Sequence, residues 1–399
     1  MQFTTKLIPL AIAIAFAGSA SAQEVVRIGH VGPISGASAH LGKDNENGAK
    51  MAVEELNAKG FTLGGKKVKL ELLLEDDGAD PKQGTAVAQK LVDAKVHGVI
   101  GHLNSGTTVP ASKIYHDAGI PQISPSATTP QYTKQGFKSA FRVVANDNKL
   151  GGTLGAYAVD TLKAKNIAVI DDRSAYGQGV ADEFVKGAKK KFPGVKIVGK
   201  EFTNPNATDF TAILTSIKAK KPDLIFFGGM DAVGGPMLKQ ARELGIKSAF
   251  TFGDGACTEE MAKLAGNAAE GMVCSQAGLP KEAASKEFVD AFKAKYGEIK
   301  QYAPYFYDAT NAVIEAMKKA NSADPAKFAP EIFNVSFQGA TGMVEFDAKG
   351  DRKGAEVTIF RLQGGKIVPV AIVKEGKSTP FKAEAPAAAA EPKKEEPKK

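Results

Sequence analysis

The sequence predicts an α/β fold made of two similar units, each with a parallel sheet. The chain has 399 residues, 43% of them hydrophobic and 24% charged, which is enough for two packed cores and too apolar for a disordered chain. Short apolar runs alternate with helical patterns, the order typical of a parallel sheet with helices on both faces. The alternation restarts near residue 149, so we expect two lobes with a cleft between them.

The first unit extends to about residue 144. The apolar spacing of Ala49, Val53 and Leu56 indicates one face of a helix. Asp80 and Pro81 suit the N-cap and first turn of another helix. We expect strands at 25–31, 67–75, 96–101, 121–124 and 140–144, and helices at 48–57, 81–95 and 107–118.

The second unit repeats this design and is followed by a segment of different character. Its helices are expected at 149–163, 177–191, from 209, and 232–244, and its strands at 167–171, 195–202, 224–227, 249–252 and 271–275. Two helices (281–296 and 305–320) and three strands (343–346, 355–362 and 366–373) come next. Their order suggests that the chain crosses back to the earlier units instead of building a third domain.

The N-terminus has the pattern of a secretory signal peptide. Lys6 precedes an apolar run over residues 7–17, and Ala20-Ser21-Ala22 forms a cleavage pattern, so we expect cleavage after Ala22. A membrane anchor is the alternative, but this run is roughly half the length that spans a bilayer. The mature protein is therefore expected to be soluble and to lie outside the cytoplasm.

The C-terminus and the charge balance say little about partners. Residues 382–399 contain only Lys, Ala, Glu and Pro, a composition expected to be disordered. A solvated tail is favoured over a docking element. The formal charge of +8 falls to about +6 without this tail and Lys6, and we expect no nucleic-acid partner.

Familiar catalytic and cofactor motifs are absent. Five His without an HExxH pair and two Cys without a CxxC predict no metal site. Gly177-Gln178-Gly179 lacks the third glycine of a dinucleotide-binding loop, and no GxSxG or complete P-loop is present. Residues 76–80 hint at a calcium loop but favour a turn and helix cap. We therefore expect no cofactor and no enzyme.

The two cysteines are expected to pair because the chain is exported. Cys257 and Cys274 would close a loop of roughly 16 to 18 residues. Two buried free thiols are the alternative.

Two hydroxyl-rich loops follow neighbouring strands, where open α/β sheets bind ligands. The first is residues 104–108 (NSGTT) and the second is residues 124–130 (SPSATTP). A helix N-terminus beside a Ser hydroxyl, such as Ser105, suits a carboxylate. The alternative is that these Ser and Thr residues only cap helices and turns.

An acidic loop in the second unit offers the opposite charge. Asp254 stands between two glycines at a strand end and could bind an ammonium group, although such a segment is also an ordinary turn. Tyr176, Met230, Tyr302 and Tyr305 occupy loop or helix-start positions nearby; packing is the alternative for each.

Four stretches resemble the type I periplasmic binding proteins of ABC transporters, in particular the leucine/isoleucine/valine-binding group. They are residues 99–112 (VIGHLNSGTTVPAS), 123–130 (ISPSATTP), 176–179 (YGQG) and 238–245 (LKQARELG). The resemblance extends from about residue 25 to 373. It implies two Rossmann-like lobes with parallel-sheet cores, joined by a hinge of three crossovers. The first lobe would comprise residues 23–144 and 276–352, and the second residues 145–275 and 353–381.

The resemblance also implies a ligand set. Ser105 and Thr128 would hold the α-carboxylate with help from the backbone around Ser126 and Ala127. Asp254 would be the main partner of the ammonium group, which Thr128 also orients.

Tyr176 would contribute from the second lobe. The chain departs from the family at Asp254 in place of Glu, at Met230 in place of Tyr, and at Leu41 in place of an aromatic residue. Asn104 occupies a position of a first-lobe disulfide that this chain lacks.

The resemblance therefore implies a monomeric binding protein that captures a free amino acid in the periplasm and delivers it to membrane permease subunits. Leu41, Met230 and Tyr302 would form an apolar pocket for a side chain of Leu, Ile or Val size. Another small ligand, such as an aromatic amino acid, a short amide or a carboxylate, is the first alternative. A secreted hydrolase or cofactor enzyme and a ligand-sensing receptor domain are the others.

Overall fold

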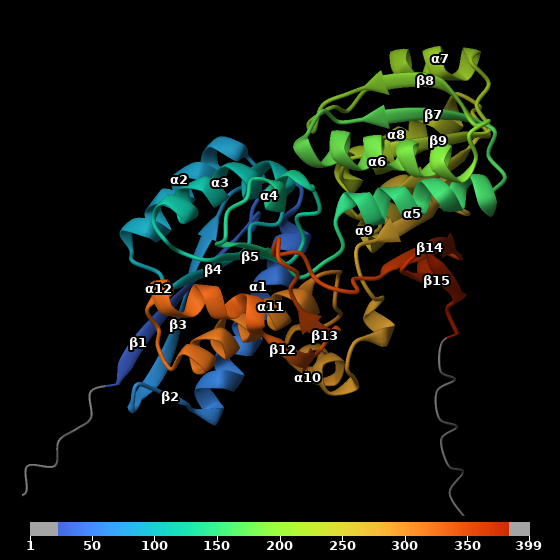
Figure 1. Ribbon diagram of the computed structural model, residues 1–399. Coiled ribbons are helices and arrows are strands. Elements are labelled where there is room, and N and C mark those ends of the chain that lie inside the picture. Colours follow the sequence, from blue (N-terminus) through green and yellow to red (C-terminus); the bar gives the residue numbers. More distant parts are fainter. Residues whose placement is uncertain (1–22, 383–399) are drawn as a thin grey trace, which may run out of the picture.

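The computed structural model describes residues 23–382 and contains two lobes, each built around its own sheet (Figure 1). The expected signal peptide and residues 383–399 of the expected tail lie outside the described residues. Within the described part, no helix is long and apolar enough to cross a membrane.

The first lobe has a six-stranded sheet in the order β2-β3-β1-β4-β5-β6. All neighbours are parallel except β2 and β3. The strands are β1 (Glu24–Gly32), β2 (Thr62–Leu63), β3 (Lys66–Asp76), β4 (Gly98–Ile100), β5 (Gln122–Ser124) and β6 (Ala140–Arg142), and the helices between them are α1 (Ala39–Lys59), α2 (Pro81–Asp93), α3 (Ser105–Asp117) and α4 (Gln131–Lys134).

Helices cover both faces of this sheet. Val26 and Ile28 of β1 share a core with Val53 and Leu56 of α1. The opposite face packs on α2 and α3, where Val31 meets side chains of both helices. This two-sided burial explains why β1 has apolar side chains on both of its faces, among them Val26, Ile28 and Val31.

The second lobe has an eight-stranded sheet in the order β16-β15-β14-β11-β10-β9-β7-β8. Its parallel part is β7 (Asn166–Asp171), β8 (Lys196–Phe202), β9 (Leu224–Gly228), β10 (Ala249–Phe252) and β11 (Val273–Gln276), and its antiparallel part is β14 (Val357–Gln363), β15 (Lys366–Lys374) and β16 (Lys377–Pro380). Helices α5 (Asp147–Asp160) and α6 (Ala175–Lys191) cover one face, and α7 (Thr211–Ala219), α8 (Asp231–Glu243) and α9 (Glu259–Ala265) cover the other.

The chain passes between the lobes three times: after β6, after β11 and before β14. The segment between the second and third passages returns to the first lobe, where α11 packs on α1 (Figure 1). It contains α10 (Lys286–Tyr296), α11 (Ala303–Ala320), α12 (Pro325–Phe328), β12 (Ser336–Gly339) and β13 (Gly342–Glu345). The expected α/β fold with a three-crossover hinge is confirmed.

Several local expectations need correction. The helix expected at 48–57 begins at Ala39, because its first turns bury polar side chains such as Asp44 and Asn45 that hide the apolar pattern. The helix expected at 281–296 is two elements, a 3₁₀ turn (Lys281–Ala283) and α10, whose N-cap is Ser285. The second sheet is mixed because β14–β16 turn back as antiparallel hairpins, which short apolar runs alone do not distinguish from parallel strands.

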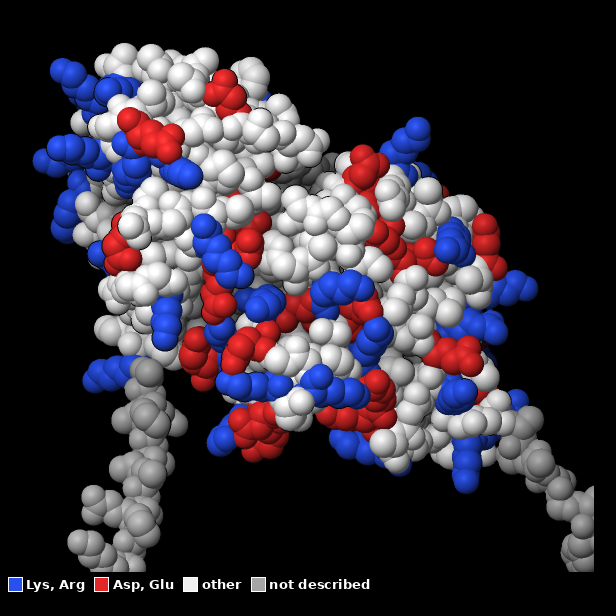
Figure 2. All heavy atoms as spheres, turned by 180° about the vertical axis from the view of Figure 1, so that it is seen from behind, with Lys and Arg blue, Asp and Glu red and all other residues white. Residues whose placement is uncertain are grey.

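Other local expectations are confirmed. Asp80 caps α2 by accepting a hydrogen bond from Gln83 N at 2.8 Å. Cys257 and Cys274 form a disulfide. On the face shown in Figure 2, basic and acidic side chains are interspersed.

Candidate functional site

A small cavity between the lobes brings together most of the predicted site residues. Its lining includes seven of the nine predicted binding residues, and Ala127 and Thr128 are not among the lining residues. The lining residues are Leu41, Leu103, Asn104, Ser105, Ser126, Tyr176, Met230, Asp254, Gly255, Gln301 and Tyr302.

The first-lobe wall consists of the two hydroxyl-rich loops. Ser105 is the first residue of α3, and its Oγ accepts a hydrogen bond from Thr129 N at 3.3 Å. This bond joins the loop after β4 to the loop after β5. The N-terminus of a thirteen-residue helix therefore opens beside the cavity with a hydroxyl group in its first turn.

Some hydroxyl groups of these loops are engaged within the protein. Ser126 Oγ donates to Leu103 O at 3.1 Å, and Thr108 Oγ1 donates to Asn104 O at 2.9 Å. The hydroxyl groups of Ser126 and Thr108 therefore stabilise the local backbone, as the alternative of turn and helix capping expects. Thr128 differs, because its Oγ1 is buried and has no hydrogen-bond partner among the described residues.

A buried arginine that the sequence did not suggest holds the second loop in place. Arg142 Nη1 donates to Ala127 O at 2.9 Å and to Thr129 O at 2.8 Å. Arg142 Nη2 also pairs with Asp351 Oδ1 at 2.7 Å. Burial works against ionisation of Asp351, but the charge and hydrogen bonds of Arg142 hold the pKa of this carboxyl below its usual value. The loop therefore has a fixed shape before any ligand arrives.

The second-lobe wall is centred on Asp254, which is 3% exposed. Its Oδ1 accepts from Tyr176 Oη at 2.7 Å, its Oδ2 accepts from Tyr302 Oη, and its backbone carbonyl accepts from Gln301 Nε2 at 2.8 Å. Burial raises the pKa of Asp254, although the two tyrosine hydroxyls oppose this. Tyr302 and Gln301 belong to the first-lobe side, so these bonds cross between the lobes.

The glycines on either side of Asp254 are required by close packing. A Cβ at Gly253 would lie 2.4 Å from Tyr176 Oη, and a Cβ at Gly255 would lie 2.7 Å from Met230 Sδ. The Cys257–Cys274 disulfide then anchors this segment to β11. These contacts show that the segment is more than a surface turn, because it forms a buried part of the cavity wall.

A second buried carboxyl group, Asp147, was missed by the sequence analysis. It is the first residue of α5 and is 0% exposed, and neither of its carboxyl oxygens has a hydrogen-bond partner among the described residues. Its backbone N donates to Thr128 O at 2.8 Å, so it sits directly beside the second loop. Burial, reinforced by the charge of Asp254 and opposed by the Thr128 hydroxyl, raises its pKa to about 8.

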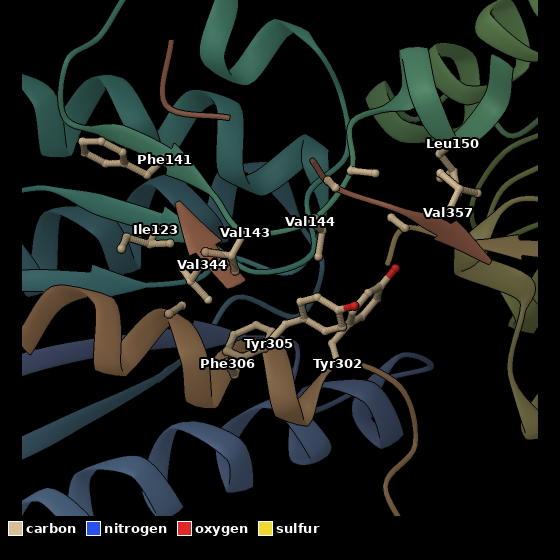
Figure 3. Close-up of a cluster of buried hydrophobic side chains, with 14 of the residues drawn as sticks. Ile123, Phe141, Val143, Val144, Leu150, Tyr302, Tyr305, Phe306, Val344 and Val357 are labelled. Carbon is tan, nitrogen blue, oxygen red and sulfur yellow. The ribbon is translucent and has the colours of Figure 1, made fainter. Parts of the chain in front are cut away.

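The rest of the lining is apolar or aromatic. Leu41 and Leu103 come from the first lobe and Met230 from the start of α8. Figure 3 shows Tyr302 and Tyr305 near the start of α11 with their hydroxyls directed toward the second lobe. Tyr305 Oη accepts from Leu279 N at 2.7 Å and does not line the cavity, so the packing alternative describes Tyr305.

Within residues 23–382, no group of three or more His, Cys, Asp or Glu side chains has an arrangement that could hold a metal ion. The cavity instead presents a helix N-terminus with hydroxyl groups on one side, the carboxyl group of Asp254 on the other, and apolar side chains as well. A cavity of this kind between two hinged α/β lobes defines a small-molecule binding protein.

Comparison with known proteins gives the family. The family described as "Periplasmic binding protein" matches residues 25–366. This chain belongs to that family, in the branch of type I proteins that includes the Leu/Ile/Val-binding proteins. The family consists of binding proteins and not of enzymes, in agreement with the expectation from the sequence.

Relatives match over nearly their whole length. The Leu/Ile/Val-binding protein homolog 1 of Brucella abortus (strain 2308) is 37% identical over 362 residues, which cover 90% of this chain and 95% of the relative. The leucine-, isoleucine-, valine-, threonine-, and alanine-binding protein of Pseudomonas aeruginosa is 35% identical, with 90% and 96% covered.

Solved structures agree with this assignment. A leucine binding protein from Thermotoga maritima has a TM-score of 0.82 at 28% identity, covering 88% of this chain and 99% of that protein. A branched-chain amino acid transporter substrate binding protein from Streptococcus pneumoniae, solved in complex with isoleucine, has a TM-score of 0.77 at 30% identity, covering 88% and 100%.

Proposed function

We propose that this chain is the substrate-binding protein of an ABC transporter and captures a free aliphatic amino acid in the periplasm. The observation that carries the proposal is the cavity between the lobes, whose two walls match the two charged groups of an amino acid. The names of the relatives from Brucella abortus and Pseudomonas aeruginosa support the same ligand class.

The first-lobe wall is suited to the α-carboxylate. Ser105 Oγ, at the start of α3, would offer a donor from the cavity wall, and the Thr128 hydroxyl and backbone groups near Ser126 would add to it from the adjoining loop. The N-terminus of α3 favours negative charge, and the Arg142 guanidinium lies directly behind the loop. A carboxylate bound here would exchange its hydrogen bonds to water for hydrogen bonds from donors that the protein holds in place.

The second-lobe wall is suited to the ammonium group. Asp254 would be its main partner, with Tyr176 fixing the carboxylate orientation through the 2.7 Å hydrogen bond. We add Asp147 to this set, because its unpaired oxygens lie beside Thr128 and its pKa responds to Asp254. A buried ammonium group offsets the cost of desolvating these carboxylates.

The apolar lining would select the side chain. Leu41, Met230 and Tyr302 present apolar and aromatic surface to the cavity, as the walls of ligand pockets commonly do. A wall of this kind favours a side chain of the Leu, Ile or Val type over a charged one. Met230 and Leu41 stand where the family is expected to have larger aromatic residues. These two positions would therefore determine which aliphatic amino acid binds most tightly.

Capture would proceed by closure without any chemical step. The amino acid binds the first lobe (residues 23–144 and 276–352), and the second lobe (145–275 and 353–381) then swings over it about the three crossovers. The closed monomer would dock on the membrane permease subunits. Residues 1–22 would direct export and would then be removed by cleavage after Ala22.

The test is calorimetric titration of residues 23–399, unfolded and refolded to remove bound ligand, with the twenty amino acids. Saturable one-to-one binding of Leu, Ile or Val, stronger than that of charged amino acids, is expected. Short amides, aromatic amino acids and simple carboxylates serve as competitors for the same site. Binding of an amide or carboxylate alone, with no response to any amino acid, overturns the proposal.

A further inference from the structure

A hydrogen bond beside the cavity joins the two lobes at a place that the ligand set does not use. His40 Nε2, in the first turn of α1, lies 2.9 Å from Asp231 Oδ2, in the first turn of α8. The same carboxylate oxygen accepts from Thr258 Oγ1 at 2.6 Å. Asp231 is fully buried, whereas the His40 side chain is 23% exposed.

The positions of the two residues tie this bond to closure of the cavity. His40 immediately precedes Leu41, and Asp231 immediately follows Met230. Leu41 and Met230 line the same cavity from opposite lobes. If one lobe moves away from the other, His40 therefore separates from Asp231 at the same time as Leu41 separates from Met230.

Acidic groups dominate the surroundings of His40. Asp231 of α8 is in contact, Glu260 of α9 is nearby, and the residue's own segment contributes a hydrogen bond to Ala37. Lys263 neutralises part of Glu260 through a 2.9 Å ion pair. Burial lowers the pKa of His40, but the hydrogen bond and charge of Asp231, with Glu260, outweigh it and raise the pKa above its usual value.

We propose that His40, Asp231 and Thr258 form an interlobe clasp that holds the closed form and couples closure to uptake of a proton. His40 is a positioning residue, since it acts on the lobes and does not line the cavity. The proposal needs lobe closure but not a particular ligand.

The direction of the pH effect follows from the acidic surroundings. On opening, His40 loses Asp231 and its pKa returns toward the ordinary value of about 6.5. The stabilisation of the closed form by protonated His40 is therefore fully present below pH 6.5. It is lost as the pH rises through the higher pKa that His40 has in the closed form. His40 therefore takes up a proton on closure at pH values between the two pKa values, and this uptake disappears once the pH lies well above the pKa of the closed form.

The experiment compares the wild type with His40→Gln, which keeps a neutral donor, and with His116→Gln, a control on the exposed side of α3. Isoleucine is titrated calorimetrically at pH 6 and pH 9, and at pH 7 in buffers of different ionisation enthalpy. At pH 6, His40→Gln should weaken binding about threefold to tenfold, because a charged hydrogen bond at a partly exposed site becomes neutral. At pH 9 the two proteins should agree within twofold.

Proton counting separates the clasp from the carboxyl groups of the cavity. Asp147 and Asp254 also titrate near the ligand, but they are unchanged in His40→Gln, so the difference between the proteins isolates His40. The wild type should take up more protons than His40→Gln, and His116→Gln should match the wild type. Equal proton counts and parallel pH profiles in wild type and His40→Gln overturn the clasp.

Small-angle X-ray scattering of the ligand-free protein gives a reading that does not depend on the proposed ligand. His40→Gln should increase the radius of gyration relative to wild type at pH 6 and not at pH 9. Identical radii for both proteins at both pH values overturn the clasp even if no amino acid binds. Absence of amino-acid binding with this pH-dependent difference preserved overturns only the proposed ligand.

Discussion

Replacement of Asp254 by Asn removes the charge that the proposed site places opposite an ammonium group. Asn keeps the size of the side chain and one carbonyl oxygen that accepts from a tyrosine hydroxyl. Removing one partner of a buried ion pair costs about 3–5 kcal/mol. Asp147 stays in place as a second carboxyl group, so we expect the lower end, roughly a 150-fold loss of affinity for leucine or isoleucine.

The fold should not suffer in the same variant. Burial of Asp254 raises its pKa, which means that its charge costs free energy in the folded protein. Asp254→Asn should therefore keep or raise the melting temperature of the ligand-free protein while it weakens binding. Calorimetric titration and thermal unfolding of the same sample separate the two effects.

Asp172→Asn is a matched control. Asp172 is a buried aspartate of the same lobe that does not line the cavity, and burial raises its pKa as well. It should leave the affinity within twofold of wild type. If Asp254→Asn also stays within twofold, or if both variants lose binding equally, the assignment of Asp254 to the ammonium group is refuted.

Three further predictions concern the second carboxyl group, the apolar wall and the disulfide. Asp147→Asn should raise the melting temperature increasingly from about pH 5 to pH 8, since the raised pKa of about 8 makes the folded protein hold a proton that the unfolded chain releases; thermal scans over pH test this, and a gain independent of pH contradicts it. Met230→Ala should weaken leucine binding about tenfold while alanine binding changes little, because only the larger side chain loses apolar contact; equal losses for both ligands would count against the proposed wall. Replacing Cys257 and Cys274 together by Ala should lower the free energy of unfolding by about 3 kcal/mol, measured in urea, and an unchanged value would show that the cross-link does not limit the unfolded chain.

Much of the architecture could be predicted because the apolar pattern is strong where strands are buried on both faces. Val26 and Ile28 of β1, or Ile167 and Val169 of β7, read as strands without any knowledge of their neighbours. The antiparallel hairpins of β14–β16 could not be distinguished from parallel strands, because pairing direction depends on where the chain returns.

The same distinction between local pattern and long-range contact decides which residues of the candidate site could be predicted. Ser105 and Asp254 stand in loops at strand ends, so local spacing was sufficient to select them. Arg142 and Asp147 could not be selected in this way. The role of Arg142 depends on its ion pair with Asp351, which is 209 residues away in sequence. The role of Asp147 depends on its burial and on the nearby charge of Asp254, which the fold brings close after the first crossover.

His40 and Asp147 should exchange protons in opposite directions when the lobes close on a ligand. An ammonium group favours ionised Asp147, so ligand binding releases a proton from a carboxyl whose pKa is raised to about 8. The clasp at His40 takes up a proton on closure, because Asp231 and Glu260 raise its pKa. The wild-type affinity should therefore change less between pH 6 and pH 8 than that of either single variant. His40→Gln should bind more tightly as the pH rises over this range, and Asp147→Asn should bind more weakly. If both variants follow the wild-type profile, proton exchange at these two residues is not linked to ligand capture.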